Sequence, residues 1–133
     1  MKLKVLFLLL IPFVMNAQDL HKHQWESRII VISTPTFESS EAALQKSYLQ
    51  TEVEKLAERK IKVYHVTNTG YTVDFNSEIL MSQNSDSEIS GFNVSLVGLD
   101  GTQKYQFTSP QPAELFFNLI DSMPMRQAEI KNK

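Results

Sequence analysis

Hydrophobic and polar positions change their spacing along the chain in a way that predicts strands alternating with helices. Residues 29–32 are four consecutive β-branched apolar residues between the polar Arg28 and Ser33, a pattern typical of a central parallel strand that is buried on both faces. Thr34-Pro35-Thr36 follows and predicts the end of this strand, because proline cannot extend a central hydrogen-bond ladder.

The most regular helical pattern comes next. Ser39 and Ser40 are candidate caps for a helix that begins near Glu41, because their hydroxyls can accept hydrogen bonds from free backbone N–H groups. Apolar residues then recur at the spacing of one helix face: Leu44, Tyr48, Leu49, Val53, Leu56 and Ala57. The sequence therefore predicts one long helix, followed by a second strand over residues 61–66, where apolar and polar residues alternate.

A hairpin and a closing helix are predicted in the last third of the chain. Asp100-Gly101 separates two alternating runs, residues 93–98 and 102–107, and this is the strongest short-range signal for a β-hairpin. Residues 113–122 then carry a second helical stripe, and Pro124 either ends that helix or begins another.

The segment between the second strand and the hairpin has a weaker pattern. We expect in it, in order, a turn at residues 68–70, a short strand over 71–75, one or two helical turns over 78–83 and a polar loop over 84–88.

The order of these elements predicts the fold. A right-handed crossover makes the first two strands parallel, the hairpin adds an antiparallel pair, and the last helix covers one face. We therefore expect an α/β domain of thioredoxin-like build, with a mixed sheet of four to five strands flanked by helices.

The first residues are expected to direct export. Met1–Lys4 is basic, Val5–Val14 is apolar and Ala17 is a small residue before a polar stretch, which is the order of a secretory signal peptide. The apolar run has about ten residues, whereas a membrane span needs roughly 20. The alternative, a buried N-terminal core helix, fits the position of the lysines less well.

Cleavage after Ala17 would divide the chain into four parts. We expect a signal peptide over residues 1–17, an N-terminal arm over 18–27, the thioredoxin-like domain over 28–126 and a polar tail over 127–133. The mature protein would then be periplasmic or extracellular.

Charge and cysteine content narrow the possible functions. Loss of Lys2 and Lys4 with the signal peptide takes the formal charge from −2 to −4. A nucleic-acid-binding protein should instead be basic, and anionic lipids attract polybasic segments, so we expect neither kind of partner. The chain contains no cysteine, which excludes disulfides and thiolate metal sites.

Three stretches carry a family resemblance: Trp25-x-x-Arg28, Leu96-Val97-Gly98-Leu99-Asp100-Gly101-x-x-Lys104, and Ile120-Asp121-x-Met123-Pro124-Met125-Arg126 with Glu129 nearby. Together they resemble a bacterial domain family of unknown function with a thioredoxin-like, peroxiredoxin-related fold. A related domain occurs in vertebrate sushi-repeat-containing and coiled-coil-domain-containing extracellular proteins. One departure is Leu99, where the family usually has a lysine. The resemblance covers the mature chain and implies an exported protein, but no particular reaction.

The thiol chemistry of thioredoxin-like proteins is excluded. Their reactive cysteine lies after the first strand, where the N-terminus of the long helix lowers the pKa of the thiol. Phe37 and Ser40 would stand here in place of the C-x-x-C pair, and Gly91-Phe92-Asn93 replaces the proline that normally precedes the third strand. The protein is therefore not expected to be a thiol oxidoreductase, and no cofactor is expected.

An enzyme without cysteine is the alternative. Thr34, Thr36 or Ser40 could act as a nucleophile if a base activated its hydroxyl. His65, at the end of the second strand, could face the same crevice, where open α/β sheets bind ligands. The reading that we favour is that the hydroxyls cap the helix and that His65 is a surface residue at the strand end.

Four residues are candidates for binding: Trp25, Arg28, Lys104 and Arg126. Trp25 could serve as a ligand platform, although a core or lid residue is the favoured reading. Arg126 could bind an anion or a partner through its guanidinium group, although a helix-end salt bridge with Asp121 and Glu129 is favoured.

No metal site is expected. His21 and His23 could place two imidazoles on one side of the arm, but two histidines without a third ligand are a weak signal.

The sequence thus predicts an exported accessory module that binds another exported protein or a peptide, through the thioredoxin-like groove or a sheet edge. The rival reading is the cysteine-free enzyme at His65. A third possibility, a small-molecule carrier, needs an apolar pocket between the sheet and the helix that contains Phe116 and Phe117.

Overall fold

A computed structural model describes residues 23–81 and 88–132 of the chain. The predicted signal peptide, the first residues of the predicted arm with His21, and most of the loop predicted over 84–88 lie outside the described residues. Among the residues described, no helix has both the length and the apolar character that a membrane crossing requires.

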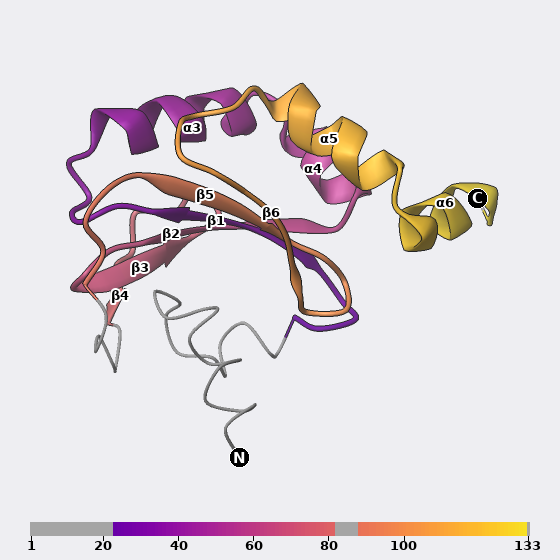
Figure 1. The fold of residues 1–133 in the computed structure, drawn as a ribbon, viewed down its shortest axis with the longest axis horizontal. Helices are drawn as coiled ribbons and strands as arrows, with labels where there is room; N and C mark the ends of the chain where they lie inside the picture. Colours follow the sequence, from indigo (N-terminus) through magenta and orange to yellow (C-terminus); the bar gives the residue numbers. More distant parts are fainter. Residues whose placement is uncertain (1–22, 82–87, 133) are drawn as a thin grey trace, which may run out of the picture.

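A six-stranded mixed sheet forms one layer, in the order β4-β3-β2-β1-β5-β6 (Figure 1). Its strands are β1 (Arg28–Ser33), β2 (Ile61–Val66), β3 (Gly70–Val73), β4 (Leu80–Met81), β5 (Asn93–Val97) and β6 (Gln103–Phe107). β1 is parallel to β2 and antiparallel to β5, and β5 is antiparallel to β6, so the predicted parallel pair and the Asp100-Gly101 hairpin are both confirmed. All six residues of β1 are buried, as its run of β-branched residues predicts.

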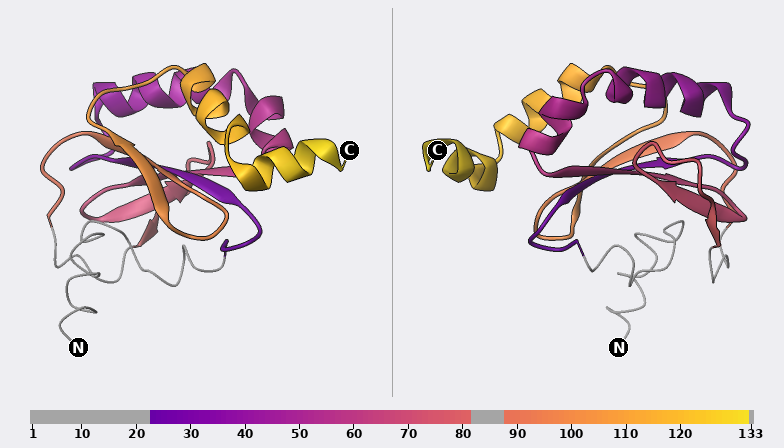
Figure 2. Two further views of the ribbon diagram at one scale, coloured as in Figure 1. Left: turned by 45° about the vertical axis from the view of Figure 1, so that its right-hand side comes forward. Right: turned by 180° about the vertical axis from the view of Figure 1, so that it is seen from behind.

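The described helices cover one face of the sheet, and the last of them, α6, projects beyond the end of the sheet (Figure 2). They are α3 (Ser40–Gln50), α4 (Val53–Glu58), α5 (Ala113–Asp121) and α6 (Pro124–Lys131). Pro124 begins α6, since proline is tolerated at a first helical position where no backbone N–H is needed. Residues 127–131, which we expected in a polar tail, therefore continue a helix.

The predicted long helix is wrong in two respects. It is interrupted at Thr51 and Glu52, and its buried face is formed by Ala42, Gln45, Leu49 and Leu56, whereas Leu44, Tyr48 and Val53 are exposed. The polar Gln45 explains the error, because its side-chain amide exchanges two hydrogen bonds of 2.8 Å with the backbone of Gln111. Because its amide is hydrogen-bonded through both its nitrogen and its oxygen, Gln45 can face the core. The neighbouring apolar residues of the predicted stripe then face the solvent.

The start of α3 agrees with the cap prediction in part. The N–H of Ala42 donates to Ser39 Oγ at 3.1 Å, whereas Ser40 is the first helical residue and not the cap.

The helix predicted over 78–83 is also wrong, because Leu80–Met81 pairs with β3 as strand β4. Gly70 permits this pairing: a Cβ there would lie 2.4 Å from the carbonyl oxygen of Leu80. The additional strand accounts for a sheet of six strands where four to five were expected.

Apolar side chains fill both faces of the sheet. The core under the helices includes Ile30, Ile32, Leu49, Leu96, Phe116 and Ile120. Phe116 and Phe117 are buried in this core, in the space that a small-molecule carrier would need to leave open. A second cluster on the opposite face includes Val31, Tyr64, Val66 and Tyr71.

Candidate functional site

The structure separates the predicted site residues into two groups at opposite ends of β1. Thr34 follows the carboxyl end of β1, and His65 is the penultimate residue of the parallel strand β2, at the end of the sheet where the thiol site of a thioredoxin-like protein was expected. Arg28 begins β1, and Lys104 and Arg126 lie at that other end of the sheet.

His65 is a buried residue, so the reading that placed it on the surface is wrong. Its side chain is on the helix side of the sheet, only 1% of the residue is exposed, and Nε2 lies 2.7 Å from Thr34 Oγ1. Phe37 packs its ring against the imidazole, with the centroids 5.1 Å apart and the planes at 79°. Phe37, which was expected in place of the first redox cysteine, therefore packs against the buried His65.

The hydrogen bonds around Thr34 fix the proton on His65. The Thr34 hydroxyl is 2.7 Å from the carbonyl oxygen of Thr36, which can only accept, so Thr34 donates its single proton there. His65 Nε2 must then donate to Thr34. The basic nitrogen is Nδ1, which is buried without a hydrogen-bond partner among the described residues.

His65 is also a poor base for electrostatic reasons. Burial, together with the positive charge of Lys46, lowers the pKa of His65 to about 4, so the ring is neutral near pH 7. The ring already holds a proton on the nitrogen that faces Thr34. The imidazole of His65 is therefore within reach of the Thr34 hydroxyl, but it is in the wrong tautomer to accept the hydroxyl proton.

The other two candidate nucleophiles do not complete such a site. Thr36 offers its backbone carbonyl to Thr34, and Ser40 is an exposed residue in the first turn of α3. Their roles are those of a turn and a helix start.

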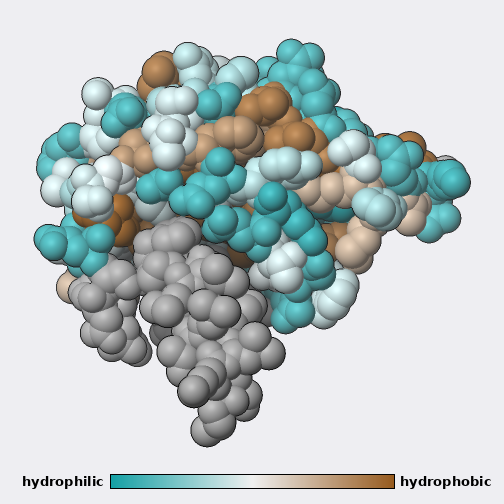
Figure 3. All heavy atoms as spheres, in the orientation of Figure 1, coloured by the Kyte–Doolittle hydropathy of each residue, from teal (hydrophilic) through white to brown (hydrophobic). Residues whose placement is uncertain are grey.

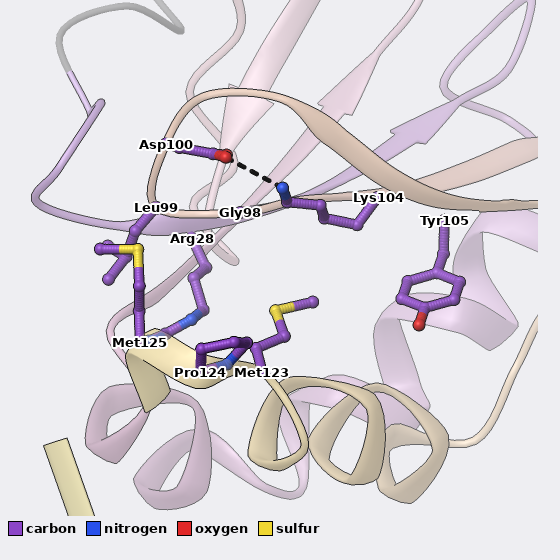
Figure 4. A pocket seen from close by; sticks show the side chains of 9 residues that line it. All are labelled: Arg28, Gly98, Leu99, Asp100, Lys104, Tyr105, Met123, Pro124 and Met125. Carbon is purple, nitrogen blue, oxygen red and sulfur yellow. Dashed lines mark hydrogen bonds and ion pairs between the residues drawn. The ribbon is translucent and has the colours of Figure 1, made fainter. Parts of the chain in front are cut away.

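A pocket of about 470 Å³ opens at the opposite end of β1. We name it the hairpin pocket, because the β5–β6 hairpin forms one wall and the junction of α5 with α6 forms the other (Figure 4). It is lined by Arg28, Gly98, Leu99, Asp100, Lys104, Tyr105, Met123, Pro124 and Met125.

The hairpin pocket unites the three stretches that carry the family resemblance. Arg28 comes from the first stretch, Gly98 to Lys104 from the second, and Met123 to Met125 from the third. Strand order explains the meeting: β5 runs antiparallel to β1, so Val97 pairs with Ile29 and the hairpin turn lies beside the start of β1.

Arg28 lies buried at the base of this pocket. Its guanidinium group donates to the carbonyl oxygen of Arg59 at 2.7 Å and to both carboxylate oxygens of Glu129 at 3.2 and 3.3 Å. The charge and hydrogen bonds of Arg28 and Arg126 outweigh the effect of burial and hold the pKa of Glu129 below its ordinary value. Glu129 therefore stays ionised beside Arg28 near pH 7.

Arg126 is also buried, and it lies behind the pocket wall. It donates to Asp121 at 3.0 Å, to Glu58 at 3.0 Å and to Glu129 at 3.3 Å. Asp121 also accepts from Arg59, whose hydrogen bond, with that of Arg126, lowers the pKa of Asp121. We name this group the charge cluster: Arg28, Arg59, Arg126, Glu58, Asp121 and Glu129.

The charge cluster balances its own charge. It holds three guanidinium groups and three carboxylates, which join β1, α4, α5 and α6. The arginines therefore have an internal partner for each positive charge, and the arrangement anchors α6 to the sheet.

Lys104 is paired at the pocket rim. Its Nζ lies 2.9 Å from Asp100 Oδ2 (Figure 4). Hydrogen bonds from Lys104 and from Thr102 lower the pKa of Asp100 to about 2, so the Asp100 carboxylate is ionised near pH 7.

Residues of the N-terminal arm hydrogen-bond to the domain, among them Gln24, which donates to the carbonyl oxygen of Asp100 at 3.1 Å. The backbone N–H of Trp25 donates to the carbonyl oxygen of Leu99 at 2.6 Å, but 62% of Trp25 is exposed, so it is not the core residue that we expected. His23 Nε2 lies 2.7 Å from the hydroxyl of Tyr64. Within the described ranges, no group of three histidine, aspartate or glutamate side chains is placed to hold a metal ion.

The apolar lining of the hairpin pocket was not predicted from the sequence. Its side chains are those of Leu99, Tyr105, Met123 and Met125, and all but Tyr105 lie inside the stretches that carry the resemblance. The antiparallel hairpin was the available signal, because it places residues 98–101 beside the first residue of β1.

Comparisons with known proteins agree with this fold. A family model described as "Domain of unknown function (DUF4174)" matches residues 19–129. Among solved structures, the reduced 2-Cys peroxiredoxin of Plasmodium vivax has a TM-score of 0.58 at 9% sequence identity, and the match covers 82% of this chain and 84% of that chain. The likeness confirms the thioredoxin-like fold and, at this identity, shows the fold alone. No curated protein matches the sequence.

Proposed function

The chain belongs to the DUF4174 family of domains of unknown function, and from this premise we propose that it is an exported module that binds a protein or a peptide at the hairpin pocket. The fold is that of a redox domain, but the sequence contains no cysteine. Phe37 packs against a buried His65 where the reactive thiol would stand. The binding site is therefore at the other end of β1.

One observation carries this proposal: the three stretches of family resemblance, far apart in sequence, line one open and largely apolar pocket. Methionine side chains adapt to partners of different shape and are favoured at binding surfaces, and Met123 and Met125 form one wall. Apolar patches gather over α5 and on the projecting α6 on the face seen in Figure 3. A pocket with exposed walls suits a protein segment better than a small molecule, which is usually enclosed.

Export is the second part of the proposal. The order of basic, apolar and small residues at the N-terminus supports it, as does the resemblance to domains of bacterial and vertebrate extracellular proteins. N-terminal sequencing of the exported protein should begin at Gln18. A chain that still begins at Met1 would contradict export.

The binding site is tested with two substitutions of the same kind, one at Met125 of α6 in the pocket and one at Met81 of the distant edge strand β4. Linear peptides are selected from a displayed library on the purified protein, and their affinity is measured for the Met125→Lys and Met81→Lys variants. Met125, in the pocket, is 42% exposed, and Met81, on β4, is 75% exposed, so neither change should impair folding. We expect Met125→Lys to weaken binding at least tenfold and Met81→Lys to leave it unchanged.

Two results would overturn the assignment of the site. One is equal binding by Met125→Lys and the unsubstituted protein, with thermal unfolding confirming that the variant is folded. The other is a loss of binding in Met81→Lys, which would place the interaction at the β4 edge.

A further inference from the structure

We propose that the partner is an extended peptide segment that pairs with the outer edge of β6 and places one uncharged apolar side chain in the hairpin pocket. The inference rests on the proposed function, and it adds the chemical class of the partner and the geometry of its binding. It is carried by a strand edge directly beside the pocket with which no other described strand pairs.

The strand edge comes first. β6 is the last strand of the sheet order, with β5 on its inner side, and residues 103–106 are all exposed. The outer edge of such a strand presents backbone N–H and C=O groups that no neighbouring strand pairs. An extended peptide can satisfy these groups by adding a strand, with main-chain hydrogen bonds supplying affinity and a side-chain pocket supplying specificity.

The pocket lies on the helix side of this same strand. Tyr105 pairs with Leu96, a residue of the core under the helices, so the Tyr105 ring points to the helix side and lines the pocket. In Figure 4, Tyr105 lies at one end, Leu99 and Met125 lie at the other, and Met123 lies between them. A peptide paired with β6 would direct every second side chain toward this wall.

Charge decides which side chain fits. Arg28 is the only member of the charge cluster in the pocket lining, and Glu129 neutralises it at 3.2 Å. Lys104 is neutralised by Asp100 at 2.9 Å. The remaining side chains of the lining are leucine, tyrosine, proline and two methionines. A charged side chain would lose water here without gaining an unpaired counter-ion, so the pocket selects an apolar side chain.

An irregularity in β6 limits the length of the pairing and argues against a second copy of the chain. The register between β5 and β6 shifts between Leu96 and Val97, so that Lys104 has no partner residue across the strand pair. A bulge and a lysine on an edge strand both hinder long edge-to-edge pairing between copies. The part of β6 that keeps a regular register is Tyr105 to Phe107, and this length suits a short segment of a partner.

The test uses synthetic peptides of one design, Ac-Ser-Val-Thr-X-Thr-Val-Ser-NH2, with leucine, methionine, glutamate or lysine at X. Affinity for the purified protein is measured by titration. We expect the leucine and methionine peptides to bind at least tenfold more tightly than the glutamate and lysine peptides. The leucine peptide is then N-methylated at one residue at a time, and we expect weakened binding at every second residue, because alternate N–H groups of an added strand face the edge.

The outcomes separate this inference from the proposed function. If binding depends on Met125 but N-methylation shows no two-residue period, strand addition is wrong and the pocket remains the site. If the glutamate or lysine peptide binds as tightly as the leucine peptide, the apolar specificity is wrong. If peptides selected from the library bind at the pocket while this series does not bind, the inference fails alone. If Met125→Lys binds all peptides as well as the unsubstituted protein, both fail.

Discussion

His65 shows how a hydrogen-bond network decides the role of a residue that distance alone would leave open. Its Nε2 lies 2.7 Å from the Thr34 hydroxyl, a separation that suits a base and its nucleophile. The Thr34 proton, however, is directed to the Thr36 carbonyl, so His65 is a donor in this pair. The network stabilises the turn after β1 and leaves the hydroxyl unactivated.

Burial of neutral His65 makes the protein sensitive to acid. The pKa of His65 is about 4 in the folded protein against an ordinary value of 6.5. The unfolded chain therefore binds the proton first, and the free energy of unfolding should fall as pH drops from 6.5 toward 4, by about 3 kcal/mol in total at 1.36 kcal/mol per pKa unit. Urea unfolding at pH 7.0, 5.5 and 4.5 measures this loss.

The control for the pH prediction is His65→Gln, whose side chain can still donate to Thr34 but cannot be protonated. Its stability should change much less over the same range. Glu129 and Asp121, whose pKa values are lowered, lose their contributions mainly below pH 4.5 and affect both proteins. An equal slope in both proteins between pH 6.5 and 4.5 would contradict the account of His65.

The helices and strands show where a hydrophobic pattern is sufficient and where it is not. The run of β-branched residues predicted β1, the alternation of apolar and polar residues predicted β2, and the Asp100-Gly101 turn predicted the hairpin. Each of these signals lies within a few consecutive residues. The buried face of α3 was misassigned, since Gln45 is buried through bonds to Gln111, 66 residues away. Strand β4 was missed because two residues paired through their backbone leave no periodic pattern.

Gln45 tests this account of α3. Gln45→Leu adds an apolar side chain to the core, but it leaves the N–H and C=O of Gln111 without their partner. We expect it to lower the free energy of unfolding by about 2 kcal/mol. Leu44→Gln, on the exposed face of the same helix, should change stability by less than about 0.5 kcal/mol. If denaturant unfolding instead showed a larger loss of stability for Leu44→Gln than for Gln45→Leu, the predicted apolar stripe would be the buried face.

The charge cluster explains how the short helix α6 is fixed to the domain. Arg126→Met keeps most of the side-chain volume but leaves Asp121, Glu58 and Glu129 without a shared cation, which should cost about 3 kcal/mol of stability. Lys104→Met breaks an ion pair between partly exposed groups, and the expected loss is less than about 1 kcal/mol. Thermal and denaturant unfolding of both variants gives the comparison, and similar losses would show that Arg126 does not anchor the helix.

At the scale of the whole molecule, the sequence predicted the fold class, because helix and strand patterns can be read directly. The hairpin pocket could not be read in this way, since Arg28, Leu99 and Met123 come together only through the strand order and the placement of α5 and α6. The two ends of β1 therefore differ. At the carboxyl end Phe37 packs against the buried His65, and at the opposite end the hairpin pocket opens.

The central claim is that binding occurs at the hairpin pocket and not at the carboxyl end of β1. Backbone amide chemical shifts, recorded while the tightest-binding selected peptide is added to the purified protein, test it most directly. We predict shift changes over residues 98–106 and 123–126, with residues 34–40 and His65 unchanged. Changes centred on residues 34–40 and His65, with the hairpin unaffected, would contradict the claim.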